Sequence, residues 1–287
     1  MIVTENNVPN IGTVNYLYEG EGGFNKVYLG TGFKITKHLS AGINGSYIFG
    51  TISNIKSVEF EEDYYFNSRY INSVTAKGFY FTYGLLYDQP LKNELQLSIG
   101  LTGSLSSKLN AVNDKNYFNY YYNVASGTDV LKDSVINESS ENGKIQMPDY
   151  FRIGATIGKP KNWTVGFDFS YYNWANFQSF DTNDSLDNSY TLHIGGEKYG
   201  EKLIYRLGAK YGTTYLNIKN TQLDEYGVTV GIGINKLFPK RPPSTVNIAF
   251  ELGQRGTLDN NLIKESYFKF HLGFTLTDIW FIPAKYD

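Results

Sequence analysis

The sequence predicts an all-β protein, an antiparallel transmembrane β-barrel in which about 11–12 strands are visible. Three observations lead to this prediction. Apolar residues alternate with small or polar ones along most of the chain, one resulting face is rich in glycine, and the other is apolar and almost uncharged. The mean hydropathy of −0.35, and the lack of an apolar run near the ~20 residues of a spanning helix, exclude a helical membrane protein.

Residues alternate with a period of two between positions 27 and 276, which places successive side chains on opposite faces of a strand. Residues 226–235 are the clearest case, because every even position is apolar and every odd one is Gly, Thr or Asn. The same pattern is strong at 95–102, 151–157, 165–171, 205–211, 246–252 and 268–276. It is weaker at 27–35, 39–49, 79–87 and 190–194.

The second face decides between a soluble β-sandwich and a membrane barrel. Glycine inside a strand costs stability on a hydrated sandwich face, whereas inside a curved barrel it relieves crowding and lets the sheet bend. The chain has 29 Gly in 287 residues, about 10% against about 7% in typical soluble domains. Many of them share the second face: Gly30, Gly32, Gly42, Gly84, Gly100, Gly154, Gly166, Gly195, Gly208, Gly227, Gly231, Gly233 and Gly273. The pattern therefore favours the barrel.

The apolar face predicts contact with outer-membrane lipid. A charge near the middle of a lipid-facing barrel surface costs roughly 2–4 kcal/mol, and this face carries almost none. Tyr and Trp gather at the segment ends, which predicts lipid-facing aromatic girdles at the two interfaces. High β-propensity explains aromatic residues in strands but not this clustering. The residues concerned are Tyr47, Tyr87, Trp163, Tyr171, Tyr172, Trp174, Tyr211, Tyr215 and Trp280.

Short and long connections alternate, as in barrels with short periplasmic turns and longer external loops. We expect short turns at 36–38, 89–93, 159–162, 198–202 and 236–244, and longer loops at 51–70, 110–149, 175–188 and 256–265. Residues 117–142 are rich in Asn, Asp, Ser and Tyr without a clean period, so we interpret them as part of a partly mobile external loop.

The start of the chain predicts a piece of a longer protein. Single-chain bacterial barrels have an even number of strands, whereas the strongest count here is odd. The first ten residues also lack the basic start, apolar stretch and cleavage site of a secretory signal peptide. In this interpretation residues 1–24 are an irregular N-terminal segment and residues 25–287 are the transmembrane barrel domain.

A family resemblance begins at residues 147–154, Met-Pro-Asp-Tyr-Phe-Arg-Ile-Gly, and runs on through 163–171 to Asn173-Trp174. This stretch resembles the outer-membrane long-chain fatty-acid transporter family (FadL/TodX type), in which a Pro-x-x-aromatic-x-x-Gly strand precedes a Trp-x-x-(Gly/Ala)-x-Asp strand that ends in Trp. Residues 251–265 and 273–281 look like a divergent branch of it.

The resemblance covers residues 22–287 and implies a fourteen-stranded parent barrel in the bacterial outer membrane. It also implies a hatch domain in the lumen and passive, porin-like uptake of long-chain fatty acids or other hydrophobic small molecules. The hatch and the first strands have no counterpart in this sequence. A related group of fourteen-stranded barrels belongs to the type IX secretion machinery.

Several charged residues have inward parity and are expected to line the lumen: Arg152, Asp168, Arg206, Lys210, Glu251, Arg255, Lys269 and His271. Glu251 and Lys269 lie on the last two strands, which should pair antiparallel, so we predict a lumen ion pair between them. Salt bridges that stiffen the barrel are the simpler interpretation of such charges. For the carboxylate of a fatty acid, the substrate that the resemblance implies, we expect contacts from Arg152, Arg206 and Arg255.

Composition and motifs argue against other classes of function. The 26 Lys+Arg and 28 Asp+Glu give a formal net charge of −2, which attracts no nucleic acid. Cysteine is absent, and the three His lack ligand-like spacing, so we expect no metal site and no cofactor. Without a G-x-S-x-G elbow or a triad spacing, the sequence predicts that the protein is not an enzyme.

Two functions stay open at this stage. The first is passive transport of hydrophobic compounds through the lumen. The second is a structural or assembly role as a barrel subunit of a secretion or envelope complex, with protein partners. An apolar lumen pocket beside a gap in the wall would favour transport, and a lumen filled by its own side chains would favour assembly.

Overall fold

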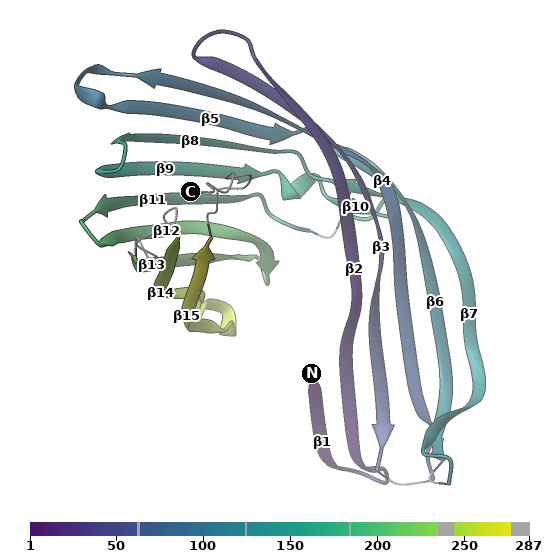
Figure 1. The fold of residues 1–287 in the computed structure, drawn as a ribbon. Helices are drawn as coiled ribbons and strands as arrows, with labels where there is room; N and C mark the ends of the chain where they lie inside the picture. The colour runs from purple at the N-terminus through teal and green to yellow at the C-terminus, as the bar shows by residue number, and fades with distance from the viewer. Residues whose placement is uncertain (62–63, 124, 184, 235–243, 277–287) are drawn as a thin grey trace, which may run out of the picture.

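The computed structural model describes residues 1–61, 64–123, 125–183, 185–234 and 244–276, and the side chains of all of these except 134–140. Within these ranges the chain forms one antiparallel sheet of fifteen strands (Figure 1). Helical structure there is limited to single 3₁₀ turns at Lys92–Glu94, Trp174–Asn176 and Asp259–Asn261. No helix in the described ranges is long and apolar enough to cross a membrane.

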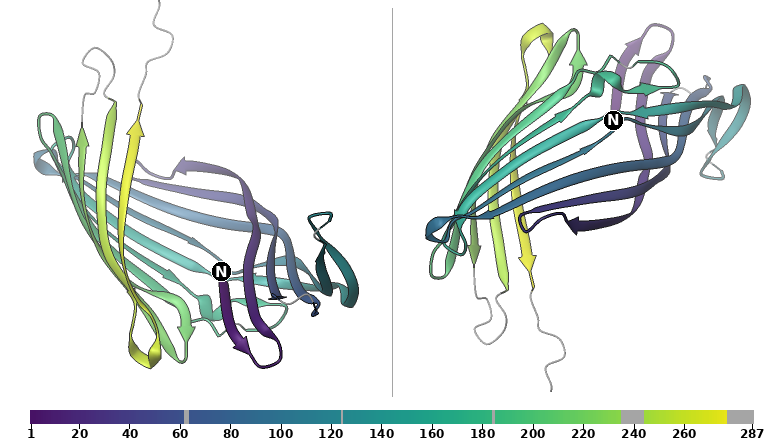
Figure 2. Two further views of the ribbon diagram at one scale, coloured as in Figure 1. Left: turned by 90° about the horizontal axis from the view of Figure 1, so that it is seen from below. Right: turned by 90° about the horizontal axis from the view of Figure 1, so that it is seen from above.

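Most strands follow one another across the sheet in chain order. The order is β1 (Ile2–Val8), β2 (Gly12–Lys34), β3 (Leu39–Phe60), β4 (Asn67–Pro90), β5 (Gln96–Ser104), β8 (Tyr150–Lys159), β9 (Trp163–Tyr172), β11 (Ser189–Tyr199), β12 (Leu203–Ile218), β13 (Thr221–Ile234), β14 (Thr245–Gly256) and β15 (Lys264–Thr275). β1 pairs only with the first residues of β2, so the eleven strands from β2 to β15 on this path form a curled wall (Figure 2). The all-β antiparallel fold is as predicted, and the twelve strands of this path match the expected 11–12, whereas the whole described sheet has fifteen.

The sheet branches along β4, which pairs with two strands in succession. Its residues 82–90 pair with β5, and its residues 67–77 pair with β6 (Ser107–Asn123). β6 pairs with β7 (Thr128–Met147), which also pairs with the two-residue strand β10 (Gln178–Ser179). Strand structure is interrupted at residues 105–106, between β5 and β6. It is interrupted again at Pro148, between β7 and β8, because the ring nitrogen of proline has no hydrogen to donate.

Beyond this branch the strands continue as a second region, which we call the arm: residues 2–22, 51–77 and 107–147. Figure 1 shows these strands bending away from the wall. At the bend Gly22 has φ +84° and Gly50 has φ +149°, conformations that favour glycine. A Cβ on Gly22 would meet the carbonyl oxygen of Thr51, and one on Gly50 would meet that of Gly23. Gly22 and Gly50 therefore allow the strands to bend here.

The expected long loops at 51–70 and 110–149 were wrong, because strands occupy most of both ranges. In addition to their backbone pairing, these strands have hydroxyl contacts between neighbouring side chains. The hydroxyl oxygens of Thr51 and Thr75 are 2.8 Å apart across β3 and β4, as are those of Ser53 and Ser73. β1 and the first half of β2 lie within residues 1–24, which were expected to be irregular. The expected turn at 236–244 lies almost entirely outside the described residues, and Trp280 lies outside them.

The base of the arm has a small apolar core of its own. Ala76, Leu109, Ala111 and Ile145 are at most 6% exposed. Phe177 and Phe180, from the connection between β9 and β11, pack on this core. The ring of Phe180 lies against Gly143, where no larger residue would leave it room. This connection therefore covers one face of the arm.

Strand register gives the wall two chemically distinct faces. One cross-strand row runs Thr156, Gly166, Gly195, Gly208, Thr229, Glu251 and Lys269. The next row runs Ala155, Phe167, Ile194, Ala209, Val228, Leu252 and Phe268, and its side chains point to the opposite side. We call these the polar face and the apolar face.

Candidate functional site

Charged side chains from four neighbouring strands meet on the polar face. Lys210 on β12 places its Nζ 2.7 Å from Glu225 Oε1 on β13 and 3.0 Å from Glu251 Oε1 on β14. From β15, Lys269 Nζ lies 3.5 Å from Glu251 Oε1, and His271 Nε2 lies 3.6 Å from Glu251 Oε2. Glu251 is the centre of the cluster, and its side chain is only 12% exposed.

Tyr267 links the two acidic residues of the cluster. Its hydroxyl lies 3.0 Å from Glu251 Oε1 and 3.1 Å from Glu225 Oε1, and donates its hydrogen to one or the other. The register sets Gly253 and then Gly227 directly beside Tyr267, and a Cβ on Gly253 would overlap its ring. The two glycines therefore let the ring lie across two strands and reach Lys210.

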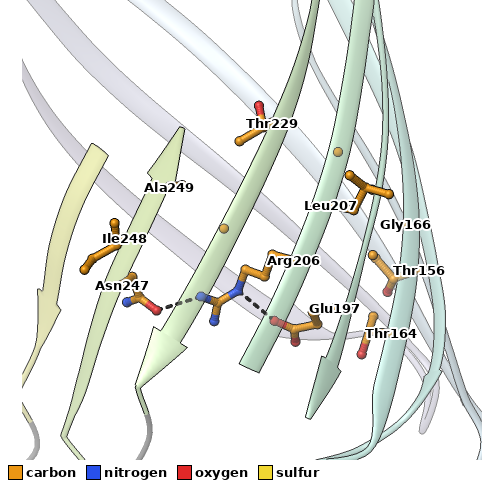
Figure 3. Close-up of a pocket in the computed structure, with 14 residues that line it drawn as sticks. Thr156, Thr164, Gly166, Glu197, Arg206, Leu207, Thr229, Asn247, Ile248 and Ala249 are labelled. Carbon is orange, nitrogen blue, oxygen red and sulfur yellow. Dashed lines mark hydrogen bonds and ion pairs between the residues drawn. The ribbon is translucent and has the colours of Figure 1, made fainter. Parts of the chain in front are cut away.

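A second polar group lies on the same face, four residues along β12 from Lys210 and nearer the short connections (Figure 3). Arg206 donates from Nε to Glu197 Oε2 at 3.1 Å and from Nη1 to Asn247 Oδ1 at 2.6 Å. These residues border a groove of about 350 Å³. Its floor is backbone, because Gly166, Gly195, Gly208 and Gly231 present no side chains there.

An adjoining groove of about 430 Å³ joins the two groups. Asp168, His193, Lys210 and Glu251 contribute its polar groups, over the same glycine floor. The polar face thus has a bare strip of backbone between two sets of charges. A ligand or a polypeptide segment can approach the wall closely at such a strip.

The three arginines expected to bind substrate occupy different parts of the wall. Arg152, on β8, donates to the hydroxyl of Tyr172 and stacks against the rings of Tyr150 and Tyr172, at 5.4 and 5.3 Å. Arg255, on β14, lies in the same cross-strand row and has Glu225 at 3.9 Å.

The structure does not bring these three guanidinium groups together. Four strands separate Arg152 from Arg255, which is about 24 Å at the usual strand spacing. Arg206 lies six residues along β12 from Gly212, which shares the row of Arg255, and that is about 20 Å. Arg206 also has a carboxylate and an amide as partners, whereas the partners of Arg152 in the described residues are tyrosines.

Sequence reasoning missed Glu225 and Tyr267. The alternation of faces could have placed both on the polar face, because residues two positions apart on a strand share a face. Tyr267 precedes Lys269 by two positions, and Glu225 precedes Gly227 by two. The register that sets Tyr267 beside two glycines depends on turn lengths, and the sequence pattern does not fix these. A second missed network lies in the arm, where Tyr120 is only 1% exposed and donates to Glu59 Oε1 at 2.6 Å.

A curled antiparallel sheet with one uncovered apolar face and one charged, glycine-rich face defines a class, the wall of an outer-membrane type β-barrel. Within that class the chain belongs to the BamG family, whose model matches residues 1–287.

Two solved structures are similar to this chain in fold. The first, a CymD monoaromatic hydrocarbon channel, has a TM-score of 0.53 at 11% identity, over 96% of this chain and 77% of that one. The second, a FadL homologue of Pseudomonas aeruginosa, has a TM-score of 0.51 at 13% identity, over 96% of this chain and 70% of that one. No curated protein sequence matches. The FadL-type resemblance is thus confirmed for the fold.

Proposed function

We propose that this chain forms the wall of a β-barrel in the bacterial outer membrane that lets hydrophobic compounds cross passively through its lumen, with no catalytic step and no cofactor. The uncovered apolar face carries the proposal. Large side chains on it are about half exposed or more, including Leu207 at 63% and Phe268 at 61%. An apolar surface of this extent marks contact with lipid or with another protein. The likeness in fold to a hydrocarbon channel supports transport.

In this proposal the polar face is the lumen wall, and its charges act on the polar end of a passing compound. Arg152 and Arg255 are the better candidates for a carboxylate, because both are exposed and neither has a carboxylate closer than 3.9 Å among the described residues. Arg206 and the Glu251–Lys269 pair are already engaged, so we assign them to stiffening the wall. The aromatic residues at the strand ends form the girdles of this barrel.

The alternative is a structural or assembly subunit of an envelope complex, and three observations favour it. The chain belongs to the BamG family, a name compatible with envelope protein partners. The charges of the polar face largely satisfy one another, as in a wall filled by its own side chains. The arm also extends well beyond the branch in the sheet, which suits a surface for a partner.

Uptake by the complete protein tests the transport proposal. The protein is reconstituted into liposomes, and entry of a radiolabelled long-chain fatty acid is compared with that of a radiolabelled hydrocarbon of similar length. We expect entry above that of empty liposomes, and a several-fold slower entry of the fatty acid alone in Arg152→Gln. Lys202→Gln, at an exposed turn, is the matched control. No entry above empty liposomes for either compound would remove the transport proposal.

A further inference from the structure

A hollow of about 610 Å³ lies on the apolar face of β9, β11, β12 and β13, on the other side of the sheet from the polar grooves. It exists because two small residues, Gly196 and Ala209, occupy neighbouring outward rows. Larger neighbours, Val165, Ile194 and Leu207, surround them and stay about half exposed. The volume falls within the roughly 300–1,000 Å³ of small-molecule sites.

One end of the hollow has a lysine between two aromatic residues. Trp163 and Tyr205 are the direct cross-strand neighbours of Lys198, so the three side chains share one outward row. Trp and Tyr in this arrangement mark the headgroup level of a membrane, where a lysine reaches the phosphates. The hollow continues from this row toward the middle of the strands.

The charge of Lys198 has no acidic partner in the described ranges. Its Nζ donates to the neutral Oδ1 of Asn162 at 2.8 Å. The next lysine in the same row, Lys159, is paired with Glu94 at 2.6 Å. Glu197, although adjacent in sequence, faces the other side of the sheet and binds Arg206. Lys198 is thus a cation at the edge of an apolar hollow.

We propose that this hollow binds one anionic phospholipid, with an acyl chain over Gly196 and Ala209 and the phosphate group on Lys198. The site rests on the membrane location proposed above and is independent of transport through the lumen. The occupant follows from the two determinants together: an acyl chain fits the apolar hollow, and an anionic headgroup complements the unpaired cation.

Fluorescence of Trp163 provides the test, because this residue lies beside Lys198. Residues 1–287 contain three tryptophans, and Trp174→Phe with Trp280→Phe leaves Trp163 as the one tryptophan among them. The protein is reconstituted into phosphatidylcholine bilayers that contain a fixed fraction of lipid with brominated acyl chains, a short-range quencher. The brominated lipid is either phosphatidylglycerol or phosphatidylcholine, so the two arms differ only in headgroup charge.

We expect brominated phosphatidylglycerol to occupy the site about fivefold more strongly than brominated phosphatidylcholine, the factor for one lysine at a membrane surface. Lys198→Gln should reduce this ratio to about one. Lys161→Gln, on the adjacent turn, is the matched control and should leave the ratio unchanged. Ala209→Leu fills the hollow and should weaken quenching by both lipids, whereas Ala155→Leu, three strands away in the same outward row, should not.

Equal quenching by the two lipids, or a ratio that survives Lys198→Gln, would overturn the proposed site. Both results leave the membrane location intact, because either brominated lipid still quenches Trp163. A protein that stays dispersed in buffer without detergent, and whose Trp163 no brominated lipid quenches, would instead overturn the membrane location. The two failures are therefore distinguishable.

Discussion

Glu251→Gln is expected to destabilise the wall by about 1–3 kcal/mol, because the substitution removes the charge that four groups share. The carboxylate contacts Lys210, Lys269, His271 and Tyr267, and its side chain is 12% exposed. Glutamine preserves the shape and one acceptor oxygen, but it leaves Lys210 with Glu225 alone, and it leaves Lys269 and His271 with no carboxylate partner among the described residues. The loss should therefore be electrostatic rather than steric.

The structure also predicts which ion pair of Glu251 has the larger coupling energy. The gross attraction of two charges 3.0 Å apart is about 5 kcal/mol at an effective dielectric constant of 20, and desolvation and solvent screening remove most of it. Lys210 is 22% exposed and lies 3.0 Å from Glu251, whereas Lys269 is 42% exposed and lies 3.5 Å away. We expect coupling energies with Glu251 of about 1–2 kcal/mol for Lys210 and about 0.5 kcal/mol for Lys269.

Double-mutant cycles measure these couplings. Glu251→Gln is combined with Lys210→Gln and with Lys269→Gln, and urea unfolding of the full chain in liposomes is followed by tryptophan fluorescence. A coupling for Lys269 as large as that for Lys210 would refute the assignment of Glu251–Lys210 as the central pair. If both couplings fall below about 0.3 kcal/mol, the limit of additivity for independent sites, the cluster contributes nothing to stability.

Three further outcomes follow from the arm. Gly22→Ala should cost about 1–3 kcal/mol because of its φ of +84°, and proteolysis of the arm should become faster than that of the wall. Leu109→Ala, at a position 1% exposed, should destabilise the arm by about 2–5 kcal/mol in the same assay, and no acceleration would contradict the small core. Burial, together with the hydrogen bond to Glu59, raises the pKa of Tyr120 to about 12. Because the folded pKa lies above the usual 10, this stabilisation is present below pH 10 and lost as the pH rises through 12; Tyr120→Phe should abolish that alkaline transition in an absorbance titration.

The wall could be predicted from the sequence because a period of two is a local property. At residues 226–235 each side chain reveals its face without knowledge of any partner, and the structure pairs this segment on both sides as expected. The arm could not be predicted in the same way. Its strands carry hydroxyl and amide groups on both faces, so Thr51 and Ser53 resemble loop residues until their partners Thr75 and Ser73 are known. A polar segment without a period of two is therefore predicted as a loop.

For the candidate site, the face on which each residue lies could be predicted, but the contacts between residues could not. Parity placed Arg152, Arg206, Lys210, Glu251 and Arg255 on one face, and they lie there in the register. Which charges meet depends on how strands shift past one another and on where glycine leaves room. Arg206 finds its amide partner, Asn247, two strands away. Tyr267 reaches Lys210 because Gly253 and Gly227 lie between them. Such contacts need the register, which a single sequence does not supply.

Removal of the two hairpins of the arm, within residues 50–76 and 108–146, separates the two proposed functions, because these hairpins contain the core at Leu109 and the polar network at Tyr120. The register shows where to cut: residues 49 and 77 are cross-strand partners, as are residues 107 and 147, so each hairpin can be shortened to a tight turn at these positions. A barrel that only transports should keep its uptake in liposomes after both cuts. An assembly subunit should keep its fold in the same preparation, yet fail to restore the envelope when it replaces the intact protein in cells. Loss of uptake with retained complementation would reverse this assignment of wall and arm.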